Sequence, residues 1–270
     1  ASNLSSANNW WGLNKCPKAV IIVAADTSAD ALAAASLSDP TGLSREPYLR
    51  RSAAADPLFD PVGGFARVDT DFAPIVLTQS ARSGATGLSV DARISVQDLR
   101  NGGCKKAREA IVVGGFSAVP AQVEDDLISL GVDRVFRVSG ANRFETSAAI
   151  AQALNTAQAP PQVRKCRDSD GRDGDLEMHF YANSVVEWRP SVDECQLLER
   201  TVVLADGVTG ADALAAGWWT SFWQVPVLLH DGSSRLRDET VVALQTLDID
   251  NIVILGGVKA ISSEIVRQAG

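Results

Sequence analysis

Runs of apolar, β-branched residues alternate with helical patterns along most of the chain. Short apolar runs predict buried parallel strands, and apolar positions at helical spacing predict the helices between them. The predicted strands are residues 19–24, 74–78, 110–113, 134–138, 201–207, 226–230 and 251–255. The predicted helices are residues 30–37, 91–99, 120–130, 144–154, 211–223, 236–247 and a last one from residue 262. This alternation indicates an α/β protein whose parallel sheets are wound by right-handed crossovers.

The same order of elements occurs twice. Residues 111–120 carry a β-branched run, a Gly pair and an apolar helix start, and residues 252–262 repeat this pattern in altered form. The helix start Asp-Ala-Leu also recurs, at residues 30–32 and 212–214. A chain that repeats its own strand-turn-helix signal is best read as a tandem of similar units.

Two irregular segments interrupt the tandem. Residues 39–72 and residues 155–199 contain many Pro, Gly and charged residues and lack a sustained apolar period. The helix-start Asp lies 84 positions before the Gly pair in the first copy and 44 in the second, so the first copy contains 40 additional residues. We therefore predict two units, residues 1–136 and residues 137–270, each with one insertion, and we expect the first insertion to lie on the surface.

The second insertion allows more than one interpretation. Residues 178–186 fit an added strand or hairpin. The Asp-rich residues 167–175 invite a calcium-loop reading, but they lack the full ligand pattern and contain interleaved Arg residues. A solvated loop is the favoured reading.

Composition and charge narrow the class of protein. With 270 residues, of which 46% are hydrophobic, the chain can bury the core of one large or two modest domains. A net charge of −8 and a pI near 4.8 argue against nucleic acid, and any anionic ligand needs a local basic patch. No apolar run reaches the roughly 18 residues of a membrane span. The polar, uncharged residues 1–9 resemble a mature N-terminus after signal cleavage, which predicts a secreted protein.

The cysteine count suggests disulfides. Four cysteines, an even number, are compatible with two disulfides in an oxidising compartment. Cys16 and Cys104 each precede a predicted strand at the same edge of one sheet, so we expect them to pair. Cys166 and Cys195 would then close the second insertion. Buried free thiols are the alternative, and a zinc site is less favoured because the chain has no C-x-x-C pair and only two His.

Several polar residues are predicted where strands end and helices begin, the edge at which open α/β sheets bind ligands. Asp30 and Asp212 could bind a hydroxyl or a cation, but helix capping and dipole complementarity are the favoured role. Arg143 has a planar guanidinium that suits a phosphate or carboxylate, or an ion pair with an acid of a neighbouring unit. The Gly pairs at residues 114–115 and 256–257 fit no nucleotide-binding pattern, so we expect turn geometry and no cofactor.

One predicted helix is unusually aromatic. Trp218, Trp219, Phe222 and Trp223 cover an arc that is too wide for one buried stripe. Packing in the core or between units is the favoured role, and sugar stacking by one Trp is the alternative. Neither His belongs to a catalytic motif, so an active site has little support.

The assembled pieces resemble a known family. Residues 137–147 read Arg-Val-Ser-Gly-Ala-Asn-Arg-Phe-Glu-Thr-Ser, and the two Asp-Ala-Leu starts, the two Pro-led strands and the two Gly-Gly strands occur around them in order. This combination resembles the cell wall binding repeat 2 family of Gram-positive surface proteins. The resemblance implies tandem Rossmann-like (flavodoxin-like) units without a cofactor. In that family there are usually three units about a pseudo-threefold axis, and they hold proteins on the wall through a secondary polymer. The Arg-x-Ser-Gly-x-x-Arg opening occurs once here, and we find about two units.

The resemblance also implies binding residues. In that family, Pro-Ile-Leu-Leu-type strand ends are associated with polymer binding. Carried over to this chain, that role falls on Pro74, Ile75, Val76, Leu77, Pro226, Val227, Leu228 and Leu229. Arg143 is the candidate contact to an anionic group of the polymer.

We therefore predict a secreted, non-enzymatic protein of the cell wall or cell surface. Tandem repeats would attach it non-covalently to a wall polysaccharide or to another envelope component. One alternative is a hydrolase or transferase that acts on wall glycans through carboxylates such as Asp206 and Asp212, which requires environments that push their pKa values apart. The other is a structural subunit that oligomerises through the Trp-rich helix.

Overall fold

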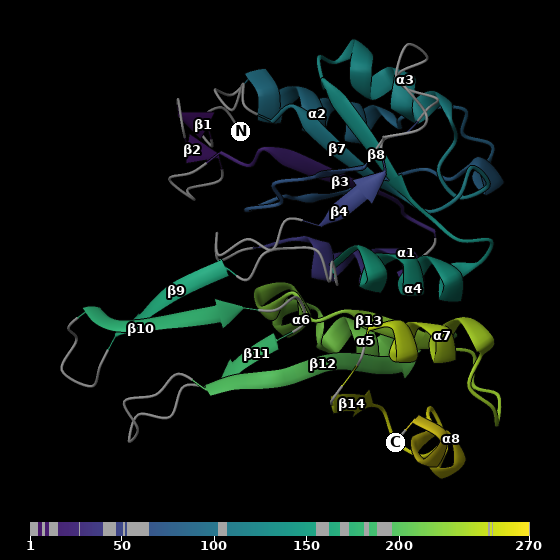
Figure 1. Cartoon of the computed structure of the whole chain (residues 1–270). Coiled ribbons are helices and arrows are strands. Elements are labelled where there is room, and N and C mark those ends of the chain that lie inside the picture. The colour runs from purple at the N-terminus through teal and green to yellow at the C-terminus, as the bar shows by residue number, and fades with distance from the viewer. Residues whose placement is uncertain are drawn as a thin grey trace.

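The computed structural model gives the fold of most of the chain. It describes residues 5–6, 9–10, 16–26, 28–39, 47–50, 52, 65–101, 107–154, 162–167, 173–180, 184–187, 196–247, 249 and 251–269. Within these ranges the chain forms two parallel sheets that lie one above the other, with helices between and around them (Figure 1).

The first sheet contains four parallel strands in the order β6-β3-β7-β8. The strands are β3 (Ala19–Ala24), β6 (Ile75–Thr78), β7 (Glu109–Val113) and β8 (Arg134–Val138). The helices are α1 (Ser28–Ala34), which continues as the 3-10 turn η1 (Ala35–Leu37), the 3-10 turn η2 (Ala81–Ser83), α2 (Val90–Asn101) and α3 (Gln122–Ser129). Every residue of β3 and β7 is buried, as expected for central strands of a parallel sheet that is covered on both faces. We call these elements the first unit.

The second sheet also contains four strands, of which three are parallel. β12 lies between β13 and β14, all three are parallel, and β11 pairs antiparallel with the start of β12. The strands are β11 (Ser184–Glu187), β12 (Gln196–Asp206), β13 (Val227–His230) and β14 (Asn251–Leu255). The helices are α5 (Ala211–Ala215), α6 (Gly217–Trp223), α7 (Asp238–Thr246) and α8 (Ser263–Ala269). We call β12 to β14 with α5 to α8 the second unit.

Helix α4 (Arg143–Leu154) joins the two units and, with α1, lies between the two sheets (Figure 1). Ile150 and Leu154 pack into the core beneath the first sheet, whereas Ala148 and Ala151 pack into the core of the second. Seven of the twelve residues of α4 are buried, which agrees with its Ala-rich sequence and its place between two cores. The predicted boundary between residues 136 and 137 falls inside β8, which pairs with β7, so the division into domains stays a prediction.

The predicted strands and helices are confirmed, apart from one helix that is divided. Residues 211–223 form α5 and α6, which meet at Ala216. The physical reason is Gly217, because Gly is a poor helix former and its backbone is more costly to order than that of any other residue. The predicted α/β fold with tandem parallel sheets is the observed one.

The first insertion differs from its prediction. Its described residues include an antiparallel pair, β4 (Tyr48–Arg50) and β5 (Phe65–Arg67), and the backbone of Ser52 donates a hydrogen bond of 2.9 Å to the carbonyl of Val135 in β8. Leu49 and Val68 are buried in the core that the first sheet shares with α4. The expectation of a surface insertion was therefore wrong for these residues. They cover the edge of the sheet that β8 would otherwise leave open.

The second insertion contains added strands, as predicted for part of it. β9 (Gln162–Arg167) and β10 (Asp173–Phe180) form an antiparallel hairpin, which extends away from the two sheets (Figure 1). Most of the predicted solvated loop at residues 167–175 lies outside the described residues, as do the side chains of this hairpin. A further short pair, β1 (Ser5–Ser6) with β2 (Asn9–Trp10), lies near the N-terminus.

Two predictions from composition can be compared with the structure. Cys16 is disulfide-bonded. The side chains of Cys104, Cys166 and Cys195 lie outside the described residues, so the predicted pairing stays a prediction. Among the helices that the structure describes, none is both long enough and apolar enough to cross a membrane.

Candidate functional site

The two helix-start aspartates lie beneath the two Gly-Gly turns. Gly114 follows β7 and Gly256 follows β14, and both have a positive φ, of 106° and 112°. A Cβ atom at Gly114 would lie 3.3 Å from Oδ2 of Asp30, and one at Gly256 would lie 2.6 Å from Oδ2 of Asp212. Each carboxylate therefore occupies the space that a side chain at the glycine would need. This geometry supports the turn role predicted for the glycines, whereas ligand binding by Asp30 or Asp212 stays a prediction.

The predicted polymer-binding strands have different environments. In β13 all four residues are buried, and Pro226 before them is buried too. In β6, Ile75 and Val76 are partly exposed, as is Pro74, and Leu77 is 52% exposed. Both strands lie at an edge of their sheet, and the difference arises because α4 covers β13.

The contact between α4 and β13 includes polar bonds. The backbone N–H of Leu229 donates to Oγ of Ser147 at 3.2 Å, so α4 supplies the acceptor that an edge strand otherwise lacks. Nη1 of Arg143 donates to the carbonyl of Gly207 at 2.9 Å, at the end of β12. Arg143 thus contacts the second unit, as one of its two predicted roles requires, but through a carbonyl and not an acid.

The start of α4 is fixed by its own side chains. Oδ1 of Asn142 accepts hydrogen bonds of 2.9 Å from the backbones of Phe144 and Glu145, which makes Asn142 the N-cap. Oε2 of Glu145 accepts from the backbone of Ala141, the residue before the N-cap, at 2.9 Å, in a variant of the capping box. A Cβ at Gly140 would lie 2.1 Å from Cβ of Glu145, so only Gly fits there. These bonds explain much of the Ser-Gly-x-x-Arg motif as the N-terminal cap of a helix.

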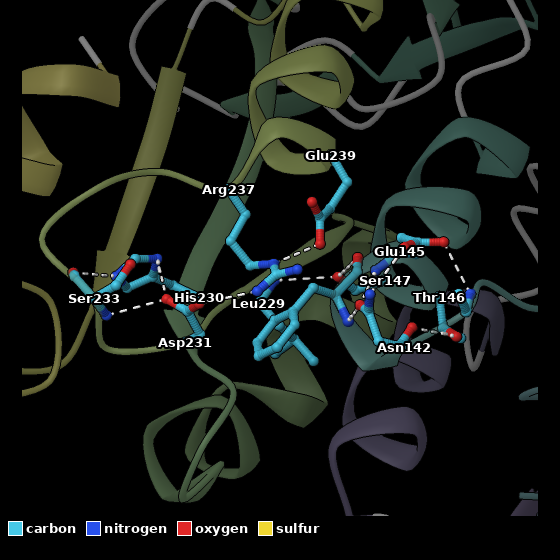
Figure 2. Close-up of polar contacts among 12 residues, drawn as sticks. Asn142, Glu145, Thr146, Ser147, Leu229, His230, Asp231, Ser233, Arg237 and Glu239 are labelled. Carbon is cyan, nitrogen blue, oxygen red and sulfur yellow. Dashed lines mark hydrogen bonds and ion pairs between the residues drawn. The ribbon is translucent and has the colours of Figure 1, made fainter.

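The loop between β13 and α7 closes over this junction (Figure 2). Arg237 donates from Nη1 to Oδ2 of Asp231 at 3.0 Å and from Nε to Oε1 of Glu239 at 2.5 Å, and its guanidinium lies 4.7 Å from the centre of the Phe144 ring. His230 is fully buried, with Nε2 2.9 Å from the carbonyl of Ser233. Arg237 therefore links the second unit to α4.

Asp206, at the end of β12, and Asp231, just after β13, are held in their ionised form. Burial would raise the pKa of Asp231, but hydrogen bonds from Ser233 and Arg237 outweigh it and lower the pKa to about 2. Burial also opposes ionisation of Asp206, yet hydrogen bonds from Thr209 and the backbone of Val208 lower its pKa below the usual value. A carboxylate with a lowered pKa is a poor general acid.

The first unit contains a second cluster of polar contacts, which the sequence did not predict. Arg137 donates from Nε to Oε1 of Glu124 at 2.5 Å and from Nη1 to the carbonyl of Gly114 at 2.6 Å, and Ser52 donates to Oε2 of Glu124. The Glu124 side chain is fully buried, and desolvation lowers the pKa of Arg137 despite the opposing effect of Glu124. No local signal in the sequence links a helix Glu with a strand Arg, and the same holds for Asp231 with Arg237.

Solved structures of other proteins share this fold. The solved structure of Cwp6 from Clostridium difficile matches 96% of this chain at 17% sequence identity, with a TM-score of 0.58. Cwp8 from Clostridium difficile matches 94% at 20% identity, with a TM-score of 0.50. This chain spans 28% of the Cwp6 chain and 29% of the Cwp8 chain. No curated protein sequence gives a significant match.

The family model named Cell wall binding domain 2 (CWB2) matches residues 137–266, from the end of β8 to α8. This range begins with Arg137, the first residue of the Arg-x-Ser-Gly-x-x-Arg motif, and includes α4 and the second unit as far as α8. The resemblance found in the sequence is thereby confirmed. Residues 137–266 of this chain match the cell wall binding domain 2 family.

Proposed function

We propose that the chain is a secreted, non-enzymatic envelope protein that attaches non-covalently to a cell-wall polymer. The observation that carries the proposal is the CWB2 domain over residues 137–266, which supports a cell-wall-associated protein. The first unit has the same order of parallel strands and helices and so supports tandem units in the attachment.

Within the domain we assign polymer contact to the turn that carries Arg143. Residues 226–229 are buried under α4, so they shape the junction and a polymer would reach them only if α4 moved away. Arg143 is partly exposed, and its planar cation suits a phosphate or carboxylate group of the polymer. Such a local cation matters here because the protein as a whole is acidic. Residues 74–77 form the second candidate surface because Leu77 is exposed.

The rival reading as a glycan hydrolase or transferase receives less support from the site. It needs one carboxyl group that stays protonated near neutral pH. Asp206, one of the two candidates, instead has a lowered pKa and accepts bonds from Val208 and Thr209. These contacts suit a turn in the backbone better than a general acid.

The test is sedimentation of the purified protein with intact walls and with walls from which acid has extracted the polymers. We expect the protein to pellet with intact walls only. Arg143→Gln should weaken this binding at least about tenfold, the size of a lost charge-assisted contact. Arg235→Gln is the matched control, because the side chain of Arg235 is 81% exposed and lies in the β13–α7 loop. Equal pelleting with both kinds of wall, or none with either, would contradict attachment through a polymer.

A further inference from the structure

His230, the last residue of β13, is a fully buried titratable side chain to which the proposed function gives no role. Its Nε2 lies 2.9 Å from the carbonyl oxygen of Ser233 (Figure 2). A carbonyl oxygen can only accept a hydrogen bond, so Nε2 carries a proton and donates it. This bond selects the tautomer, because in a neutral ring Nδ1 must then be an unprotonated acceptor.

The surroundings of Nδ1 do not suit an acceptor. Nδ1 is buried and has no hydrogen-bond partner in the described part of the chain. The carboxylate of Asp231 lies beside it, with Oδ1 at 3.8 Å. Asp206 of β12 pairs in register with His230, and its carboxylate also interacts electrostatically with the ring. An unprotonated Nδ1 would turn its lone pair toward negative charge and stay a buried acceptor without a donor, which is unfavourable.

The two carboxylates do not compete for a proton near neutral pH. Burial opposes the ionisation of both, yet hydrogen bonds lower the pKa of Asp231 to about 2 and the pKa of Asp206 below its usual value. Both groups therefore stay ionised in mild acid. A proton that enters this cluster binds to the imidazole, since both ring N–H groups then face an acceptor.

Other charged groups on the elements that pack against β13 have partners of their own. Arg237 faces the cluster, because its Nη1 binds Oδ2 of Asp231 at 3.0 Å. Its charge opposes a proton on the ring, and the charge of Glu239, to which it also binds, offsets this effect. The further groups are Arg143 and Glu145 of α4, which bond to backbone groups, and Asp30 of α1, which lies beneath the turn at Gly114.

We propose that His230 takes up a proton at Nδ1 as the pH falls and thereby strengthens the contact between the β13–α7 loop and α4. The imidazolium donates from Nε2 to Ser233 and from Nδ1 to Oδ1 of Asp231, once a small movement of the loop closes the gap of 3.8 Å. The other oxygen of Asp231 binds Arg237, whose guanidinium lies against the ring of Phe144 in α4. Alkaline pH removes one of the two donors and weakens this contact. The proposal does not depend on attachment to the wall.

Nitrogen NMR of the untagged chain tests the protonation directly. The chain has two His residues, so His179→Gln leaves His230 as the single source of ring signals. At about pH 6 both ring nitrogens of His230 should carry a proton, and at about pH 9 only Nε2 should. Asp231→Asn removes the acceptor of the second proton and should weaken the binding of that proton at least about tenfold. Asp238→Asn is the matched control, because the Asp238 side chain is 87% exposed and pairs with Arg235, and it should leave the titration unchanged.

Thermal unfolding tests whether the proton stabilises the fold. A proton that the folded chain binds more tightly than the unfolded chain stabilises the fold at low pH, and this stabilisation is lost as the pH rises. His230→Gln cannot bind the proton. The melting temperature of the wild type should therefore exceed that of His230→Gln by about 3 °C more at about pH 6 than at about pH 9.

Three results would overturn the proposal. One is a folded protein in which His230 still carries a single ring proton at about pH 5. Another is a difference in melting temperature between the wild type and His230→Gln that does not change with pH. The third is an equal effect of Asp231→Asn and Asp238→Asn on the titration, which would show that net charge alone governs the proton. If His230→Gln does not fold, the NMR titration decides the question by itself.

Discussion

Gly256 is the position where the structure makes its sharpest energetic prediction. Its φ is 112°, and an added Cβ would lie 2.6 Å from Oδ2 of Asp212 and 2.8 Å from Cβ of Ala260. A non-glycine residue with a positive φ costs about 1–2 kcal/mol, and overpacking against fixed neighbours costs about 1–3 kcal/mol. We therefore expect Gly256→Ala to lower the free energy of unfolding by about 3 kcal/mol.

Two other glycines allow the cost of the positive φ to be separated from the cost of the steric clash. Gly232 has a φ of 76° but nothing within 4 Å of an added Cβ, so Gly232→Ala should cost about 1 kcal/mol from the backbone alone. Gly257, the neighbour of Gly256, has neither a positive φ nor a contact within 4 Å. Gly257→Ala should therefore change stability by less than about 0.5 kcal/mol.

The assay is urea unfolding of the three variants and the wild type under non-reducing conditions, with thermal melting in parallel. A loss of about 3 kcal/mol corresponds to a fall in melting temperature of roughly 6–12 °C for a domain of this size. Asp212→Ala removes one clashing atom, so Gly256→Ala should cost less in that background. If Gly256→Ala costs no more than Gly232→Ala, and Asp212→Ala does not change its cost, the reasoning about the buried carboxylate is wrong.

Three further predictions concern the buried polar contacts. Ser147→Ala leaves the backbone N–H of Leu229 without its acceptor and should cost about 1–2 kcal/mol in urea unfolding, and a loss below about 0.5 kcal/mol would show that the bond is dispensable. Arg137→Met leaves the Glu124 charge buried and should cost about 3–5 kcal/mol, but the double variant with Glu124→Gln should cost less, so equal losses would argue against an ion pair. Because folding lowers the pKa of Asp231 to about 2, its ionised form stabilises the fold above about pH 4, and this stability is lost as the pH falls from about 4 to 2. Asp231→Asn should therefore lose less stability than the wild type between pH 5 and pH 3, and an identical pH dependence would contradict the assignment.

The pattern of the sequence located the parallel strands of both sheets and the helices that connect them. The buried β-branched run at Ala19–Ala24 and the Asp-Ala-Leu helix starts are local signals, and each is strong enough to be read without knowing the fold. The helix over residues 211–223 was an exception, because Gly217 divides it at a position where the apolar period continues. The surface location predicted for the first insertion also failed, because burial of Leu49 depends on β8 and α4, which lie far away in sequence.

The candidate site was predictable only in part. The motif around Arg143 identified the family, and its local hydrogen bonds follow from helix-cap chemistry. The partner of Arg143 is the carbonyl of Gly207, which no side-chain pattern reveals. The contact of Arg237 with the ring of Phe144 likewise joins a loop to a helix that is distant in sequence, whereas its partner Asp231 lies in the same loop.

The sequence by itself determined the class of fold, the repeat and the family, because periodicity, turn residues and helix caps act over a few neighbouring residues. Only the tertiary structure decided which of two equivalent surfaces is buried. Leu77 and Leu229 lie in similar strands, as do Leu32 and Leu214 in similar helices, yet one of each pair is buried and the other is exposed. The physical reason is that burial depends on which element packs against a strand or helix. Leu32 and Leu229 are buried because α1 of the first unit packs against β13 of the second.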